Sequence, residues 1–175
     1  GETDPRPLGS AVMNFARPAA AAIFLLAVLA GCSRSGTGPT PPADAPVAKH
    51  EHHPPHGGTP VVLGDEIYHL ELVLDPAAGK LDAYVLDGEM ENFIRSKQPS
   101  FEAVATVGGQ PQTLVFRAIA DPATGETVGD TSLFEASAGW LKATRSFDAV
   151  LTSLDIRGTV FTHVAFNFPQ GNDKD

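Results

Sequence analysis

The sequence predicts an all-β fold, an antiparallel two-sheet sandwich of immunoglobulin-like size that occupies residues 57–175. Three observations predict it: short segments in which apolar and polar residues alternate, turn residues such as Pro and Gly between these segments, and the lack of a long apolar repeat with helical spacing. Seven or eight short strands fit this part of the chain, and an open barrel is the alternative architecture.

The clearest hairpin lies near the start of this domain. Residues 67–74 alternate so that Tyr68 and three leucines share one face, while His69 and Glu71 share the other. We expect a half-buried strand with His69 and Glu71 on its exposed face. Residues 75–80 supply Pro and Gly for a tight turn, and residues 81–86 return as the partner strand.

A second hairpin is predicted from residues 101–107 and 113–119, which flank a Gly-Gly-Gln-Pro turn. Its apolar residues are expected to contribute to the core. They are Phe101, Val104, Val107, Leu114 and Phe116.

The last part of the domain predicts one more short strand over residues 133–136 and a single helical turn within residues 138–146 that covers the core. Two further strands, over residues 147–154 and 159–168, close the fold. In the second of these the even-numbered residues, from Val160 to Phe168, are expected to face the core.

The N-terminal region predicts export. Residues 19–30 form an apolar run that as a helix would span about 18 Å, less than the hydrocarbon core of about 30 Å, and therefore favours a secretory signal over a membrane span. With Arg17 before it, this run indicates a signal peptide over residues 13–31. Residues 1–12 are then upstream sequence or an artificial extension.

The end of the signal, Leu29-Ala30-Gly31-Cys32, resembles the lipobox of bacterial lipoproteins. The resemblance implies cleavage before Cys32, lipidation of its thiol and acylation of the new amino terminus; several acyl chains together hold a protein persistently on a membrane. Ser33, in place of Asp, then implies attachment to the periplasmic face of the outer membrane. An ordinary secretory signal with an incidental Cys, or a signal anchor, is the alternative.

Residues 32–56 are rich in Pro and poor in large apolar side chains, which predicts a disordered tether with a reach on the order of 70 Å. The tether ends in a histidine tract. Its imidazoles suit Cu, Ni or Zn, so this tract predicts a weak metal site, with a solvated pH-sensitive linker as the alternative. The candidate ligands are His50, His52, His53 and His56.

The sheet carries the residues of a second, more preorganised candidate metal site. His69 and Glu71 share a predicted exposed face, and His163 points away from the predicted core of the last strand. These three side chains could meet if the two strands are neighbours.

Composition excludes several function classes. Lys and Arg number 12 against 21 Asp and Glu, for a net charge of -9, so nucleic-acid binding is not expected. The single Cys can close no internal disulfide. The sequence lacks a serine-hydrolase elbow, an HExxH motif and a phosphate-binding glycine loop, so we do not expect an enzyme.

Residues 56–65 and 68–73 resemble small bacterial periplasmic lipoproteins and segments beside the periplasmic adaptor subunits of heavy-metal efflux systems. Two functions are therefore expected. The first is a lipid-anchored module whose sandwich contacts another protein of the cell envelope. The second is a metal-handling lipoprotein that uses its histidines, linked, as the resemblance implies, to heavy-metal efflux.

Overall fold

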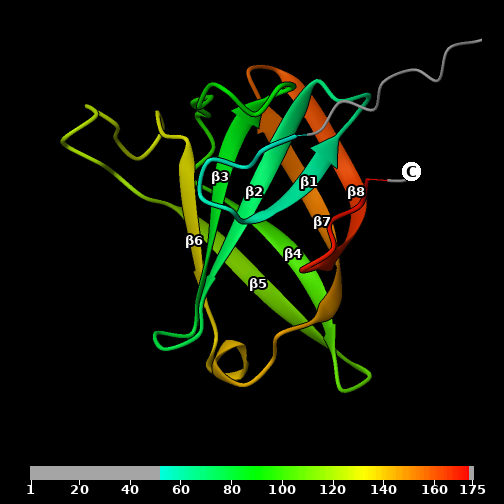
Figure 1. The fold of residues 1–175 in the computed structure, drawn as a ribbon. Helices are drawn as coiled ribbons and strands as arrows, with labels where there is room; N and C mark the ends of the chain where they lie inside the picture. Colours follow the sequence, from blue (N-terminus) through cyan, green and yellow to red (C-terminus); the bar gives the residue numbers. More distant parts are fainter. Residues whose placement is uncertain (1–51, 174–175) are drawn as a thin grey trace, which may run out of the picture. The chain divides into compact units, whose positions relative to one another are not determined.

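The computed structural model describes residues 52–173, which form eight strands and one short 3-10 helix (Figure 1). The strands are β1 (Thr59–Leu63), β2 (Tyr68–Asp75), β3 (Lys80–Asp87), β4 (Ser100–Val107), β5 (Gln110–Ala118), β6 (Leu133–Ser137), β7 (Phe147–Ile156) and β8 (Thr159–Phe168), and the helix is η1 (Gly139–Lys142). Every strand pair is antiparallel, so the predicted all-β antiparallel fold is confirmed.

Hydrogen bonds run through all eight strands in the order β1-β2-β3-β6-β5-β4-β7-β8. β1, β2 and β3 lie in front of β4, β5 and β7 (Figure 1), so two layers face each other as in the predicted sandwich. The layers are not separate sheets, because β6 pairs with β3 on one side and with β5 on the other. β1 also approaches β8, which leaves the sheet nearly closed and brings it close to the open-barrel alternative.

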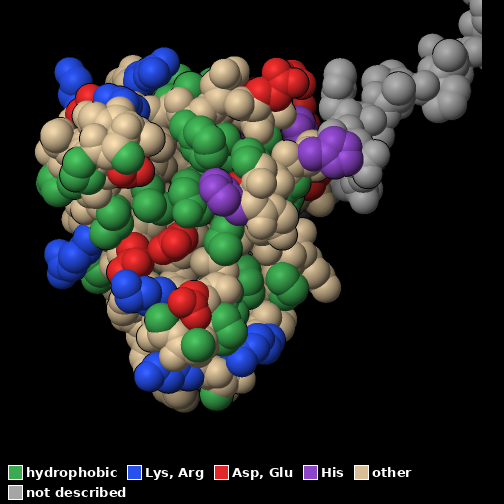
Figure 2. Space-filling view, turned by 60° about the vertical axis from the view of Figure 1, so that its left-hand side comes forward, with side chains coloured by type: hydrophobic (Ala, Val, Ile, Leu, Met, Phe, Trp, Pro, Cys, Tyr) green, Lys and Arg blue, Asp and Glu red, His purple; other side chains and the backbone are tan. Residues whose placement is uncertain are grey.

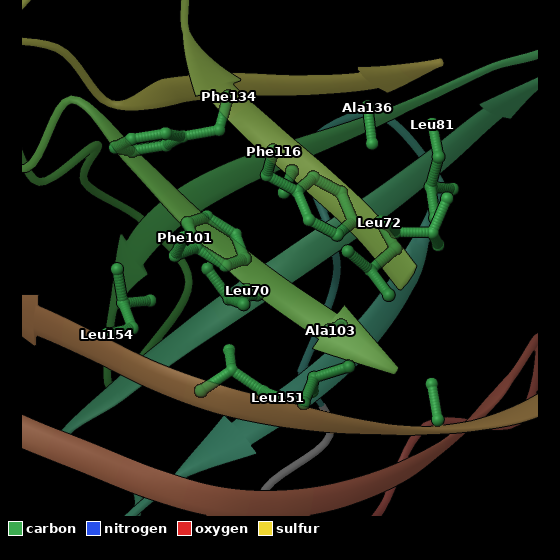
Figure 3. Packing of buried hydrophobic residues seen from close by; sticks show 14 of the residues in the cluster. Leu70, Leu72, Leu81, Phe101, Ala103, Phe116, Phe134, Ala136, Leu151 and Leu154 are labelled. Atoms are coloured by element: carbon green, nitrogen blue, oxygen red, sulfur yellow. The ribbon is translucent and has the colours of Figure 1, made fainter. Parts of the chain in front are cut away.

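The core fills the space between the two layers. Leu70 and Leu72 of β2 point toward residues of β4, β5 and β7, including Phe116 and Leu151 (Figure 3). The rings of Phe101 and Phe116 stack with their centroids 4.7 Å apart. The predicted core positions Phe101, Leu114 and Phe116 are confirmed as buried.

Two details of the predicted core are wrong. Val104 is exposed, because Ala103 and Ala105 take the inward positions beside it on β4. Val160 is also exposed, whereas Phe161 is buried. The alternation of β8 changes phase at His163, whose φ of 55° lies in the left-handed region, so even-numbered residues face the core only after this point.

The helical turn predicted within residues 138–146 is present as η1. Leu141 of this helix is fully buried, and its neighbour Trp140 packs edge-on against Phe147 with ring centroids 5.2 Å apart. η1 therefore closes one end of the core. Within residues 52–173, no helix combines the length and the apolar character needed to cross a membrane.

We expect Phe116→Ala to lower the free energy of unfolding by about 3–5 kcal/mol, because it removes a fully buried ring from the centre of the core. Urea denaturation measures this change. Val128→Ala is the matched control: Val128 is 61% exposed, and its truncation should change stability by less than about 0.5 kcal/mol. Equal effects of the two substitutions would contradict this description of the core.

Candidate functional site

The segment that precedes β1, residues 52–58, lies against the outer face of β2 and β3; we call it the strap. The backbone N–H groups of His56 and Gly58 donate hydrogen bonds to Glu71 on β2, and the ring of His56 stacks on Tyr84 of β3. The strap therefore belongs to the folded domain. Residues 52–56, which the sequence assigns to the tether, thus include side chains that contact the sheet.

The strap overturns the prediction that His69 and Glu71 lie on an exposed face. The two side chains do point away from the main core, but both are fully buried. The alternating pattern of β2 correctly predicted that these two side chains lie on the face of the strand opposite the main core. It could not show that a segment earlier in the chain supplies polar partners and covers that face.

Glu71 holds the strap in place through three N–H donors. Oε1 accepts the backbone N–H of His56 at 2.7 Å and that of Gly58 at 2.9 Å, and Oε2 lies 2.8 Å from Nδ1 of His56. A carboxylate can only accept, so Nδ1 of His56 carries the hydrogen. A Cβ at position 58 would lie 2.6 Å from the carbonyl oxygen of Leu72, so the strap needs Gly there to approach this closely.

Two aromatic side chains, Tyr84 and Phe93, also pack against the ring of His56. The rings of His56 and Tyr84 stack with centroids 4.0 Å apart, and Phe93 lies tilted 5.9 Å from His56. Figure 2 shows histidine side chains on this face of the molecule, beside hydrophobic and acidic ones. Packing against these rings and hydrogen bonds to Glu71 together hold His56 in place on the sheet.

His69 is buried in a defined tautomer. Its Nδ1 lies 3.3 Å from the backbone carbonyl oxygen of Asp87, which can only accept, so Nδ1 carries the hydrogen and Nε2 presents a lone pair. Nε2 has no hydrogen-bond partner among residues 52–173. Burial, followed by the neighbouring charge of His52, lowers the pKa of His69 below its ordinary value of 6.5. The ring is therefore neutral at pH 7.

The loop after β3 keeps the carbonyl of Asp87 in place. Oδ1 of Asp87 accepts the backbone N–H groups of Glu91 and Asn92, and Oδ2 accepts the side-chain amide of Asn92. These bonds close the loop on itself next to His69. A backbone carbonyl that receives one ring N–H and so exposes the other nitrogen is the usual support of a metal-binding imidazole.

His52, at the start of the strap, contacts His69. Their ring centroids are 4.5 Å apart, and the planes are tilted by 50°. Nε2 of His52 is buried, and within the described region it also has no hydrogen-bond partner. Oε1 of Glu66 lies 3.9 Å from it. We call His52 and His69 the histidine pair; it unites one imidazole from the strap with one from the sheet.

The remaining predicted ligands are placed differently. His53 is exposed, and His56 is engaged by Glu71. His163 is exposed on β8, and β1 separates β8 from β2, so His69, Glu71 and His163 are not brought together on neighbouring strands. His50 and Cys32 lie outside the described residues. Over residues 52–173, no group of three or more His, Cys, Asp or Glu side chains is arranged to hold a metal ion.

Sequence reasoning missed the contact between the two halves of the histidine pair. It assigned His52 to a tether and His69 to an exposed strand face, and it gave no role to Asp87, Tyr84 or the loop that follows β3. A signal was available in the sequence, since a carboxylate between apolar residues of a strand, as in Glu71, needs donors if its face is covered.

The surface has two other notable hollows within residues 52–173. An open hollow of about 690 Å³ is lined by charged side chains, among them Arg95, Lys97 and Arg157. A shallower one of about 370 Å³ lies over β4, β7 and β8, where Val104 and Val150 face each other across the strands. Neither contains a buried polar group without a partner, so the histidine pair is the more distinctive feature.

Comparison of the chain with protein-family models, with curated proteins and with solved structures gives no match in any of the three.

We expect the free energy of unfolding to decrease as the pH falls below 6.5, because the unfolded chain binds a proton at His69 that the buried ring resists. The unfolded state holds more protons than the folded state between the lowered pKa and 6.5, so this stability is complete above the window and is lost as the pH drops through it. Urea denaturation from about pH 7.5 to about pH 5 measures the slope.

His69→Leu removes the titrating ring and should flatten this part of the profile, whereas His163→Leu, at an exposed position, should preserve it. An unchanged slope in His69→Leu would show that another group causes the pH dependence.

Proposed function

We propose that the protein binds a transition-metal ion at the histidine pair. The observation that carries the proposal is that the rings of His52 and His69 are in contact, and that each has a buried Nε2 with no hydrogen-bond partner in the described part of the chain. Leaving a buried polar atom unpaired costs about 1–3 kcal/mol. A metal ion that accepts both lone pairs would remove this cost.

The protonation state of His69 suits this role. Imidazole binds metal ions as a neutral ring, and His69 is neutral at pH 7 because its pKa is lowered by burial. The carbonyl of Asp87 receives the hydrogen on Nδ1, which leaves Nε2 of His69 as the donor atom. The residue that the sheet contributes, His69, therefore has a neutral ring with its Nε2 lone pair free for an ion.

The strap side of the site links metal binding to the docking of the strap. His52 reaches His69 only while Glu71 holds His56 and Gly58 on the sheet. An ion that bridges His52 and His69 would add a further bond between strap and sheet. Binding of the metal ion at the histidine pair should therefore stabilise the docked strap by mass action.

We expect the full chain to bind one such ion, and His69→Gln and His52→Gln each to weaken binding by about tenfold or more, because each removes one donor nitrogen. Isothermal titration with Cu(II), Ni(II) and Zn(II), and with Cu(I) under anaerobic conditions, measures affinity. Binding should also weaken as the pH falls below about 6.5, where imidazole becomes protonated.

His163→Gln is the matched control, since it removes an exposed imidazole far along the chain from the pair. Loss of binding in this control, or unchanged binding in both His52→Gln and His69→Gln, would contradict the assignment. If none of the four ions binds the intact protein, the proposal is wrong.

We propose in addition that the protein is a lipoprotein anchored by Cys32 to the periplasmic face of the outer membrane. The support is the Leu29-Ala30-Gly31-Cys32 sequence at the end of the apolar run. Cys32→Ala should prevent lipid labelling and move the protein from the detergent phase to the aqueous phase on phase partitioning. A variant that stays in the detergent phase would contradict lipidation at Cys32.

A tethered interaction module without metal is the second candidate. It is favoured by the apolar pair Val104 and Val150, which are 37% and 39% exposed and lie opposite each other on β4 and β7. Such a pair on an outer sheet face can contact another protein of the envelope. This candidate takes precedence if the metal titration shows no binding.

A further inference from the structure

We infer that the hollow lined by Lys97 and Arg157, which we call the basic hollow, binds a phosphate-bearing sugar. It has a volume of about 690 Å³ and lies between the loop that joins β3 to β4 and the turn that joins β7 to β8. These two segments lie at the same end of the sheet (Figure 1). The volume is within the range of small-molecule sites, about 300–1,000 Å³. Neither member of the histidine pair lines this hollow, so the inference adds a second site.

Positive charge is concentrated at the basic hollow. Residues 52–173 contain seven Lys and Arg side chains, and three of them, Arg95, Lys97 and Arg157, line it. The whole chain carries a net charge of -9, so this concentration runs against the overall charge of the protein. Grouped cations of this kind attract an anionic ligand and can donate charge-assisted hydrogen bonds to it.

Two of the three cations have no anionic partner in the described part of the chain. Arg95 is engaged, since its guanidinium pairs with Asp130 at 3.0 Å and donates to the backbone carbonyl of Thr124 at 2.6 Å. Lys97 and Arg157 form no salt bridge with any side chain of residues 52–173. Their charges are therefore available to a ligand.

The backbone that carries these two side chains is held in place across the hollow. Ser96, which is 1% exposed, donates its hydroxyl to the carbonyl oxygen of Asp155 at 2.9 Å. The backbone N–H of Asp155 in turn donates to Oε1 of Gln98 at 2.7 Å. Lys97 lies between Ser96 and Gln98, and Arg157 follows Asp155 by two residues. The two segments are thus joined before a ligand arrives, which lowers the entropy cost of binding.

The turn itself gives no reason for an Arg at position 157. Ile156 pairs with Thr159, so Arg157 and Gly158 are the two central residues of the turn, and their φ angles of 53° and 88° are both positive. Asn, Asp and Gly are the residues that favour the first of these positions. Among residues 52–173 no hydrogen bond or salt bridge of the Arg157 guanidinium compensates for this. An external anion supplies the missing partner.

The acceptors that line the hollow select the rest of the ligand. A phosphate group has enough oxygens to contact an ammonium and a guanidinium group together, as Lys97 and Arg157 present them. Asp130 and Asp155 also line the hollow, and their carboxylates would repel a bare anion. Hydroxyl groups can instead donate hydrogen bonds to them. A sugar that carries a phosphate satisfies the cations and the carboxylates at the same time.

The experiment titrates the full chain with a panel of hexose phosphates, with inorganic phosphate, with glucose and with glucuronate, and follows backbone amide signals by NMR. We expect at least one hexose phosphate to bind about tenfold or more tightly than inorganic phosphate, glucose or glucuronate. Signals of residues 95–98 and 155–158 should shift. Binding should weaken with added salt, because exposed charges are screened.

Variants test the two cations. Lys97→Gln and Arg157→Asn should each weaken binding of the hexose phosphate by about tenfold, because each removes one charged donor. Arg157→Asn suits the turn and therefore keeps the fold, which covers the case in which another variant does not fold. Arg117→Gln is the matched control: Arg117 is exposed on β5 and does not line the hollow, so binding should change by less than about twofold.

The outcomes decide between the alternatives. Inorganic phosphate that binds as tightly as every hexose phosphate overturns the sugar, and tighter binding of glucuronate overturns the phosphate. Binding that survives both Lys97→Gln and Arg157→Asn overturns the site, and binding of no member of the panel overturns the whole inference. His69→Gln should leave sugar-phosphate binding unchanged, so this result is independent of the metal titration.

Discussion

The hydrogen bonds of the buried Glu71 carboxylate are the interaction on which the position of the strap depends. It receives two backbone N–H groups and one ring N–H from the strap, and none of the three donors lies on β2 itself. Removing one partner of such a buried group costs more than the contact contributes, because the remaining groups are left without water or a replacement. His52 is placed against His69, and His56 against Tyr84, as a result of this one anchoring point.

β2 is therefore buried on both faces, which is unusual for a strand of an antiparallel sheet. Its inner face contributes Leu70 and Leu72 to the core, and its outer face contributes His69 and Glu71 to a polar region beneath the strap. Hydrophobic burial stabilises the packing of the inner face, and hydrogen bonds to the strap stabilise the packing of the outer face. Among the residues of β2, His69 is the exception on this outer face, because its Nε2 has no hydrogen-bond partner in the described part of the chain.

The alternating residues of β2, β3, β4 and β5 made the all-β class and most of the core predictable, since alternation depends only on which face of a strand is apolar. β1 was not predicted, because Thr59-Pro60-Val61-Val62-Leu63 has no clear alternation and contains Pro. The site itself was only partly predictable. The residue types of the tract and of β2 indicated imidazole chemistry, but the contact between His52 and His69 depends on how the strap returns over the sheet, which local pattern does not encode.

The junction between β5 and β6 has a consequence for association with other chains. β6 pairs with β5 only at Arg117 and Ala118, so the preceding part of β5 has β4 as its one paired neighbour. A strand edge of this kind offers backbone groups to which a foreign strand could add. Pro111 lacks an N–H, and polar Gln110, Gln112 and Thr113 surround it, which makes this edge a poor template for a regular ladder. This part of β5 thus keeps an unpaired edge whose sequence disfavours the addition of a foreign strand.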